Sequence, residues 1–339
     1  MAEPAIPRPI RTGSAAAAAI LVTAVVFVMV PAAAADDELA SLPPTSAHAV
    51  RLGAYDGHVV WSQQVAEGRH VLMRWRRGKL DPLPVAEGPV PFDVNVGSDA
   101  RGRAVAVYSR CAGDAAVYRD FSDCDVYWLP LVSGGERRLA RISALRGSEF
   151  APAIWRGDIA FASWRSARAP VTVSVLRRGA RRAVALARLS RERLGRDPDP
   201  DDAAFRGIGG MDLTSKAVVF EWAAGGFSEL RRVSLPGRRS RVIDRGFVQE
   251  GLAVEMRSPL ATPREILWVR KTSSPCDETT IVSNRAGRRR FTLATPRIVD
   301  ALAKDGRDVY AITVTAEPCQ LPTAVTLVRL AQLSFTDTI

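Results

Sequence analysis

Short stretches in which apolar and polar residues alternate recur along most of the chain. Alternation with a period of two residues is typical of a β-strand that buries one of its faces. The most regular stretches are rich in Val, Ile and aromatic residues and are bounded by Gly, Asp or Arg turns. They comprise residues 58–62, 105–109, 159–163, 218–222, 265–269 and 309–313. Each of them is therefore predicted to form a strand.

The six predicted strands recur at a regular spacing. Equivalent positions are separated by 47, 54, 59, 47 and 44 residues. A second alternating stretch follows each strand, a short basic turn leads to a more polar stretch, and another short stretch precedes the unit. Four short strands per unit and a period of this size are typical of a propeller. We therefore predict an all-β fold, a six-bladed β-propeller of four-stranded antiparallel blades, over residues 49–339.

Two segments of the predicted propeller are irregular. Residues 183–194 combine Ala, Leu and Arg in an order that would allow a short helix. The outer strand of the last blade also has two candidates. Residues 332–335 could supply it directly, or residues 36–48 could supply it from the other end of the chain and close the ring. The sequence leaves both possibilities open.

Residues 1–35 have the features of an export signal. Arg8 and Arg11 precede an apolar run of sixteen residues from Ala15 to Val30, and small residues then lead into an acidic stretch. This order is typical of a signal peptide with an A-x-A cleavage site. A retained anchor helix is the alternative, but the run is shorter than the ~20 residues that a membrane span needs. We expect cleavage, no transmembrane segment afterwards, and a protein that is secreted or associated with the cell envelope.

The four cysteines form an even set, which favours two disulfides in an exported protein. Cys111 and Cys124 bracket one loop after a predicted strand. Cys276 and Cys319 lie in equivalent loops of neighbouring units, which can approach closely on one face of a propeller. We therefore predict the pairs Cys111–Cys124 and Cys276–Cys319. No C-x-x-C motif occurs, so a redox site or a zinc ribbon is not indicated.

The second and third units carry a recognisable repeat. Residues 152–163 read P-A-I-W-R-G-D-I-A-F-A-S, residues 125–127 read D-V-Y, and residues 134–140 read G-G-E-R-R-L-A. This order resembles the TolB-type propeller repeat, and the resemblance implies the same six-bladed fold. TolB carries an α/β domain before its propeller. The residues before the first unit here leave no room for one, so we do not expect the role in the Tol system to carry over.

Catalytic motifs are scarce. The three histidines are His48, His58 and His70, and the last two stand at strand ends where solvated turn residues are expected. Neither G-x-S-x-G nor H-E-x-x-H occurs. The acidic residues of 197–202 have part of the spacing of a calcium loop but lack its Gly and its closing Glu. No catalytic residue, metal or cofactor is predicted.

Polar residues on the innermost strands are candidates for ligand binding. In a propeller the first strand of each blade lines a central tunnel, whose mouth is a usual ligand site. Carboxylates and an amide alternate with apolar residues on these predicted strands, namely Asp93, Asn95, Asp212, Glu255 and Asp300. These groups either bind a ligand or only hydrate the tunnel.

The chain is strongly basic, with a net charge of +11 and a pI near 10.2, and it contains only four lysines. Arginines gather in the turn before the last strand of five units. The predicted basic rim consists of Arg76, Arg77, Arg178, Arg181, Arg239 and Arg289. Charge at these turns could protect the outer strands from edge-to-edge pairing, or it could bind an anionic surface.

These patterns favour an extracytoplasmic binding or scaffold protein. Its expected partner is an unknown protein or an anionic envelope surface, without specific binding of nucleic acid, because charge alone is weak support for the latter. We expect a monomer. The alternative is a propeller hydrolase or lyase that uses carboxylates at the tunnel mouth for general acid–base chemistry. An enzyme would bring two carboxylates together and shift the pKa of one, whereas a binding protein would leave these charges scattered.

Overall fold

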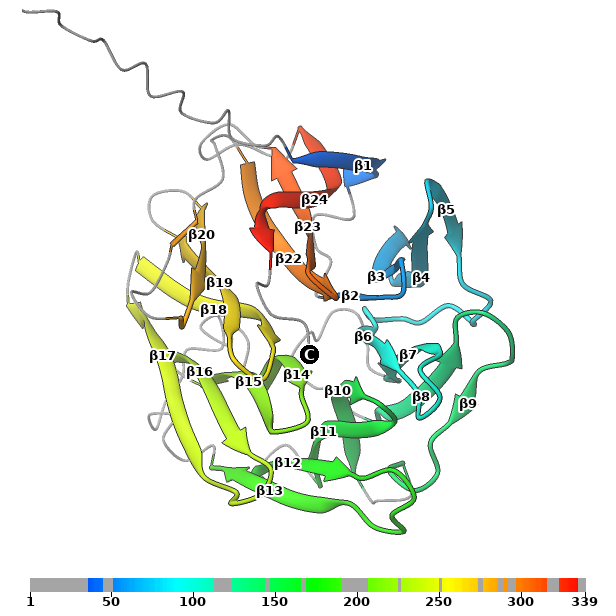
Figure 1. The fold of residues 1–339 in the computed structure, drawn as a ribbon, viewed down its shortest axis with the longest axis vertical. Helices are drawn as coiled ribbons and strands as arrows, with labels where there is room; N and C mark the ends of the chain where they lie inside the picture. The colour runs from blue at the N-terminus through cyan, green and yellow to red at the C-terminus, as the bar shows by residue number, and fades with distance from the viewer. Residues whose placement is uncertain are drawn as a thin grey trace, which may run out of the picture. The chain divides into compact units, whose positions relative to one another are not determined.

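The computed structural model describes residues 36–44, 51–112, 123–143, 147–165, 169–190, 207–224, 227–249, 252–273, 277–285, 290–291, 297–315 and 323–334. These residues form 24 β-strands and no α-helix, and thus contain no helix able to cross a membrane. The strands make six four-stranded antiparallel blades arranged in a ring (Figure 1). The predicted six-bladed β-propeller is confirmed.

The first three blades each take four consecutive strands, in order from the ring centre outward. Blade 1 contains β2 Leu52–Tyr55, β3 His58–Ala66, β4 Arg69–Arg76 and β5 Lys79–Pro82. Blade 2 contains β6 Asp93–Ser98, β7 Ala104–Arg110, β8 Asp125–Pro130 and β9 Arg137–Arg138. Blade 3 contains β10 Ser148–Trp155, β11 Asp158–Trp164, β12 Val171–Leu176 and β13 Val184–Leu189.

The remaining blades continue the ring, and the last one takes its outer strand from the N-terminal part of the chain. Blade 4 contains β14 Gly207–Leu213, β15 Ala217–Ala224, β16 Phe227–Ser234 and β17 Ser240–Gln249. Blade 5 contains β18 Leu252–Ala261, β19 Ile266–Ser273, β20 Asp277–Ser283 and β21 Arg290–Phe291. Blade 6 contains β22 Arg297–Asp305, β23 Asp308–Thr315, β24 Ala324–Ser334 and β1 Asp37–Leu42.

The ring is closed by β1, which pairs antiparallel with β24. Of the two candidates that the sequence left open, the N-terminal segment is the outer strand, and residues 332–334 belong to β24. An ion pair between Asp37 and Arg329 supports this pairing, with the Arg329 Nε 3.0 Å from the carboxylate. Residues close to opposite ends of the described chain therefore share one blade.

The hydrophobic core is divided among the gaps between neighbouring blades. One cluster joins Trp61 of blade 1 to Ile312 of blade 6, and another joins Leu72 of blade 1 to Ala106 of blade 2. The middle strands supply fully buried residues from both of their faces, which is why they read as nearly continuous apolar runs. Face-to-face packing of the blades thus provides most of the apolar burial.

One secondary-structure prediction is wrong. Residues 183–194 were expected to allow a short helix, but residues 184–189 form strand β13, which pairs with β12. Leu186 and Leu189 are buried in the strand conformation. The free energy from this ladder and from burying two leucines outweighs the small helix propensity of Ala, Leu and Arg. Residues 191–194 lie outside the described residues.

Candidate functional site: ring centre and arginine face

The structure places all five predicted tunnel residues on innermost strands. Asp93 and Asn95 lie on β6, Asp212 on β14, Glu255 on β18 and Asp300 on β22. They therefore come from blades 2, 4, 5 and 6. We call the space between the innermost strands the ring centre.

Asp93 and Asn95 connect blade 2 to blade 3. The Asp93 Oδ2 accepts hydrogen bonds from the backbone N–H of Ala151 and from the Ser109 hydroxyl, both at 3.2 Å. The Asn95 Oδ1 accepts a hydrogen bond from the Ile154 N–H at 3.1 Å. Both side chains thus satisfy amides of the neighbouring innermost strand, which a buried backbone requires.

Asp212 links three blades at once. Its Oδ2 accepts a hydrogen bond from the Ala261 N–H of blade 5 at 2.6 Å and forms an ion pair with Lys304 of blade 6. Its Oδ1 accepts a hydrogen bond from its own neighbour Leu213 at 2.9 Å. This carboxylate is buried and has three donors, so it is fully engaged in the structure.

Glu255 and Asp300 share one arginine that the sequence did not single out. Arg257 lies on the same strand as Glu255 and binds its Oε2 through two nitrogens, at 2.6 and 2.8 Å. A third nitrogen of Arg257 is 3.9 Å from Asp300 Oδ1, across the boundary between blades 5 and 6. These two carboxylates therefore face a common cation.

A second unpredicted arginine crosses the ring. Arg51, just before β2 in blade 1, donates through Nη2 to the Ile208 carbonyl of blade 4 at 3.4 Å. Its Nε is 3.6 Å from Asp93 Oδ1 in blade 2. Arg51 is buried, and it connects blades that are not neighbours. No innermost strand was predicted for the first unit from the sequence, so the position of Arg51 beside that strand could not be predicted either.

The ring centre also contains a buried acid, Glu221 of β15. A side chain at Gly209 of β14 would collide with the Glu221 carboxylate, so this glycine gives the acid room beside the innermost strand. Burial raises the pKa of Glu221 to about 8. The positive charge of Arg257 acts to lower this pKa, and the negative charge of Glu255 acts to raise it. Glu221 is therefore mostly protonated at neutral pH.

A signal for Glu221 was present in the repeat. When the six units are aligned on their second strands, the position of Glu221 is occupied in each of the other five units by a buried apolar or aromatic residue. These residues are Trp61, Tyr108, Ala162, Trp268 and Ile312. An acid at a core position of a repeat is unusual enough to mark a special environment.

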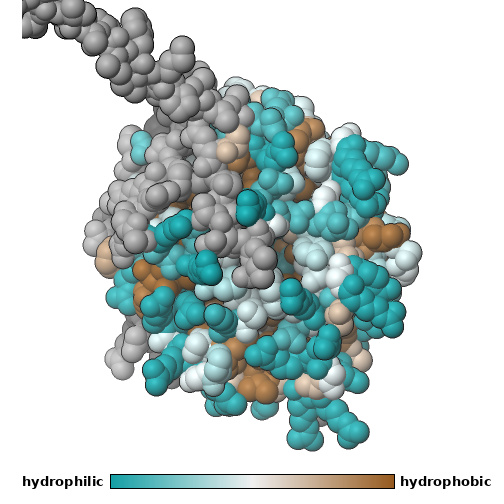
Figure 2. All heavy atoms as spheres, viewed as in Figure 1, coloured by the Kyte–Doolittle hydropathy of each residue, from teal (hydrophilic) through white to brown (hydrophobic). Residues whose placement is uncertain are grey.

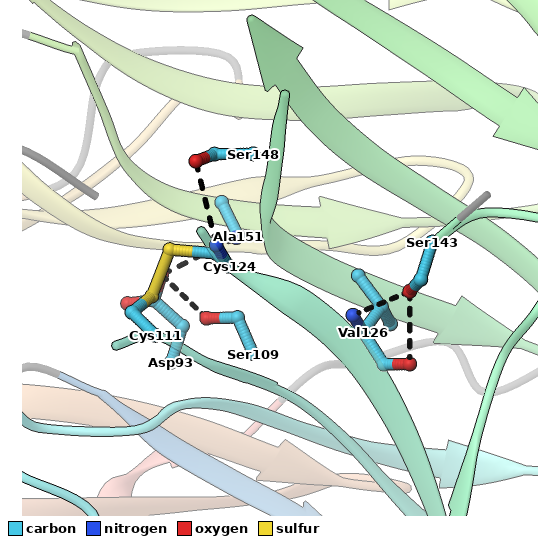
Figure 3. Close-up of a disulfide and its surroundings, with 8 residues drawn as sticks. All are labelled: Asp93, Ser109, Cys111, Cys124, Val126, Ser143, Ser148 and Ala151. Carbon is cyan, nitrogen blue, oxygen red and sulfur yellow. Dashed lines mark hydrogen bonds between the residues drawn. A yellow bond between two sulfur atoms is a disulfide. The ribbon is translucent and has the colours of Figure 1, made fainter. Parts of the chain in front are cut away.

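A further buried carboxyl, Glu149, lies near the start of β10, the innermost strand of blade 3. Neither of its oxygens has a hydrogen-bond partner among the described residues. Burial raises its pKa to about 8, and the charge of Asp125 raises it further. Its backbone N–H donates to the Cys124 carbonyl at 2.9 Å, so Glu149 adjoins the predicted Cys111–Cys124 disulfide, which is confirmed (Figure 3).

The remaining predictions for cysteine and histidine have different outcomes. Cys276, Cys319 and His48 lie outside the described residues. His58 and His70 were expected to be solvated, but both are buried. His58 begins β3, between β2 and β4, and His70 pairs through its backbone with Gly88. Burial lowers the pKa of both, that of His58 to about 4, so each is neutral at neutral pH.

The predicted basic rim lies at one end of the blades. The turns that join the third strand to the outer strand of blades 1 to 4 share this end, because every blade runs in the same direction from the ring centre outward. Among the predicted residues, Arg77, Arg178, Arg181 and Arg239 are exposed, and Arg76 is half-buried. Arg289 lies outside the described residues. We call the surface formed by these turns the arginine face.

Several arginines on this face have no acidic partner. Arg177 forms an ion pair with Asp158 at 2.5 Å, and Arg137 lies over the Trp128 ring. By contrast, a second group of exposed arginines forms no ion pair with any residue of the described part of the chain. This group comprises Arg77, Arg178, Arg181, Arg182, Arg238, Arg239 and Arg241. Figure 2 shows one side of the molecule, where hydrophilic residues cover most of the coloured surface and apolar patches are small and separate.

Comparisons with known proteins add the fold but no function. No protein-family model matches the chain, and no curated protein is similar to it in sequence. Among solved structures, it is similar to the fucose-specific lectin of Aleuria aurantia, at 10% identity over 83% of this chain and 94% of the lectin, with a TM-score of 0.51.

The chain is also similar to TolB from Acinetobacter baumannii, at 13% identity over 82% of this chain, with a TM-score of 0.46. A puromycin hydrolase matches at 15% identity over 91% of this chain, with a TM-score of 0.48. The chain spans 64% of the length of TolB and 58% of that hydrolase. The six-bladed fold that the TolB-type resemblance implied is confirmed by the blades themselves, and matches of such low identity show nothing beyond a fold.

Proposed function

We propose that this protein is an exported propeller that binds an anionic partner at the cell envelope through its arginine face. One observation carries the proposal: exposed arginines without acidic partners recur at the same end of several blades, including Arg77, Arg178 and Arg239. The Cys111–Cys124 disulfide and the pattern of residues 1–35 support export.

The chemistry of the guanidinium group supports an anionic partner. A guanidinium donates two parallel hydrogen bonds to a phosphate or a carboxylate, which a lysine ammonium cannot do. Repetition on several blades allows one extended polyanion to be bound at many points, so weak contacts add up. Because exposed charges are screened within about 8 Å at physiological ionic strength, the binding should be sensitive to salt.

The test compares two triple variants with the same change in net charge. Arg77→Glu, Arg178→Glu and Arg239→Glu reverse the arginine face. Arg69→Glu, Arg165→Glu and Arg188→Glu reverse exposed arginines toward the other end of the strands. Binding to vesicles that contain phosphatidylglycerol is measured across a salt series, with phosphatidylcholine vesicles as the neutral reference.

The face variant should lose binding at low salt, and the control variant should keep most of it. Equal losses would mean that only net charge matters. Unchanged binding by the face variant would mean that these arginines serve to protect the outer strands from edge-to-edge pairing. Either result rejects the proposal.

A second candidate function, a hydrolase or lyase at the ring centre, is favoured by one observation. Glu221 has a pKa of about 8 and feels the negative charge of Glu255, so it could donate a proton near neutral pH. Glu255 is, however, engaged by Arg257, and Asp212, the buried carboxylate of β14, is engaged by Lys304. A panel of chromogenic glycosides and esters tests this candidate, since any turnover should be lost in Glu221→Gln with the fold retained.

A further inference from the structure

The outer strand of blade 4 differs from the outer strands of the other blades. Strand β17 has ten residues, whereas β1 and β13 have six each, β5 has four, and β9 and β21 have two each. It contains no proline, which would remove a backbone donor from the edge. Its length and composition leave a long edge for strand pairing.

One edge of β17 is only partly occupied. Over Ser240–Phe247 its first edge pairs with β16, whereas its second edge pairs with β18 only at Val248 and Gln249. Beyond those two residues β18 turns toward the ring centre as the innermost strand of blade 5. A side chain at Gly246 would collide with the Val254 carbonyl, so β18 still lies against β17 at this glycine, although the two strands no longer pair there. Within the described chain, the second edge from Ser240 to Gly246 has no strand partner.

Apolar side chains accompany this edge. Phe247 is 59% exposed and Val242 is 40% exposed, and they are two of only six large exposed hydrophobic residues in the described chain. Phe247 stands opposite Phe227 on β16. Outer strands that do not bind a partner usually carry charge or proline at such positions. Strand β17 carries charge at Arg241, Asp244 and Arg245, but it also carries these two exposed apolar groups, which a further strand could cover.

The charges around this edge of β17 indicate what kind of partner it would bind. Arg241 stands directly opposite Arg232 on β16, and neither has an acidic partner among the described residues. Two cations directly opposite each other repel, and burial together with this repulsion lowers the pKa of Arg232. Arg238 and Arg239 add two more exposed cations in the preceding turn. A second copy of this chain, with a net charge of +11, would bring the same arginines together.

We propose that the free edge of β17, from Ser240 to Gly246, binds an extended acidic peptide of a partner protein as a fifth strand of blade 4. The backbone of the peptide pairs with the edge, its apolar side chains contact Val242 and Phe247, and one of its carboxylates lies beside Arg241. This site uses backbone pairing and does not depend on the arginine face binding an anionic surface.

The test uses a synthetic peptide of about six residues, the usual length of a strand, in which Glu alternates with Val or Thr. Hydrogen exchange of the full chain is followed with and without the peptide. A matched peptide has the same sequence but carries N-methyl groups at every second residue, so it keeps the charge and loses the donors on one edge. Both possible sets of methylated positions are used, because either edge of the peptide could pair.

The acidic peptide should slow exchange within residues 240–246 and leave strand β13 unchanged. One of the two methylated peptides should lose this protection. Arg241→Glu should weaken binding about tenfold, or about 1.4 kcal/mol. Arg188→Glu on β13, an equal charge change on another outer strand, should not weaken it. Val242→Ser with Phe247→Ser should also weaken binding without changing the net charge.

Three results would overturn the proposal. Equal binding of both methylated peptides would show that charge alone holds the peptide. Absence of protection in residues 240–246 at saturating peptide would show that the edge does not pair. Protection of this edge that rises with protein concentration in the absence of peptide would make a second copy of the chain the occupant.

Discussion

The ring centre and the arginine face are both rich in charge, but they use it differently. In the ring centre, Asp212 faces Lys304 and Glu255 faces Arg257; Asp212 is buried, and the other three side chains are half-buried. On the arginine face, Arg77 and Arg239 are exposed and have no acidic partner among the described residues. The same types of side chain therefore stand in opposite environments within one ring.

The difference follows from the cost of burying charge. A buried ion without a partner is destabilising by several kcal/mol, so the ring centre must pair its charges or keep an acid protonated, as with Glu221. A solvated guanidinium has no such requirement. The paired charges hold the blades together, and the unpaired ones are free to contact another molecule.

The largest effect of a single substitution at one pH is expected at Asp212. Asp212→Ala removes the acceptor for the Ala261 N–H and the partner of Lys304, and it leaves both near the ring centre. We expect the free energy of unfolding to fall by about 3 kcal/mol. Chemical denaturation measures this change. Asp212→Asn, which keeps an acceptor for the amide, should recover part of the loss. A loss for Asp212→Ala as small as that of a surface substitution would mean that this link does not stabilise the ring.

The second prediction is a dependence of stability on pH that comes from the two buried carboxyls, Glu149 and Glu221. Both have a pKa of about 8 in the folded protein against an ordinary value of 4.5. Between these values the folded state keeps a proton that the unfolded state releases, so stability falls as the pH rises. Each group contributes at most about 1.4 kcal/mol per pH unit. Above about pH 8 both groups have lost their proton in the folded protein as well, and their contribution to the free energy of unfolding is gone.

The measurement is the slope of unfolding free energy against pH between about pH 5 and pH 8. Glu149→Gln with Glu221→Gln should flatten this slope, whatever the stability at a single pH. Asp99 is a suitable control, because hydrogen bonds from Arg103 and Arg101 oppose its burial and lower its pKa below this window. Asp99→Asn should leave the slope unchanged. An equal slope in the double variant would contradict the assignment of raised pKa values.

The fold could be predicted because strand alternation and spacing are local properties of the sequence. The middle strand of each blade was recognised from runs such as residues 105–109, which lie within β7. The outer strand of blade 6 could not be assigned, because β1 and β24 are almost 300 residues apart and their pairing depends on closing the ring. β13 was missed for a similar reason, since its pairing with β12 decides its conformation.

The candidate site was only partly predictable. Period-two alternation placed Asp93 and Asp212 on innermost strands, but it could not say that each would satisfy amides of the next blade. Arg51 was missed because its contact with Ile208 joins residues 157 positions apart. Side-chain reach across a ring depends on tertiary geometry, which a repeat pattern does not encode.

The smallest effect on stability is expected on the arginine face. Arg77→Glu, Arg178→Glu and Arg239→Glu together should change the free energy of unfolding by less than about 0.5 kcal/mol per site, because these side chains are exposed and break no ion pair within the described chain. Thermal and chemical unfolding should coincide with those of the parent protein, even where vesicle binding is lost. By contrast, Arg177→Glu on the same face should cost more, since it places a second carboxylate beside Asp158. A large loss of stability in the triple variant would mean that these arginines support the blades, and the contrast with the ring centre would fail.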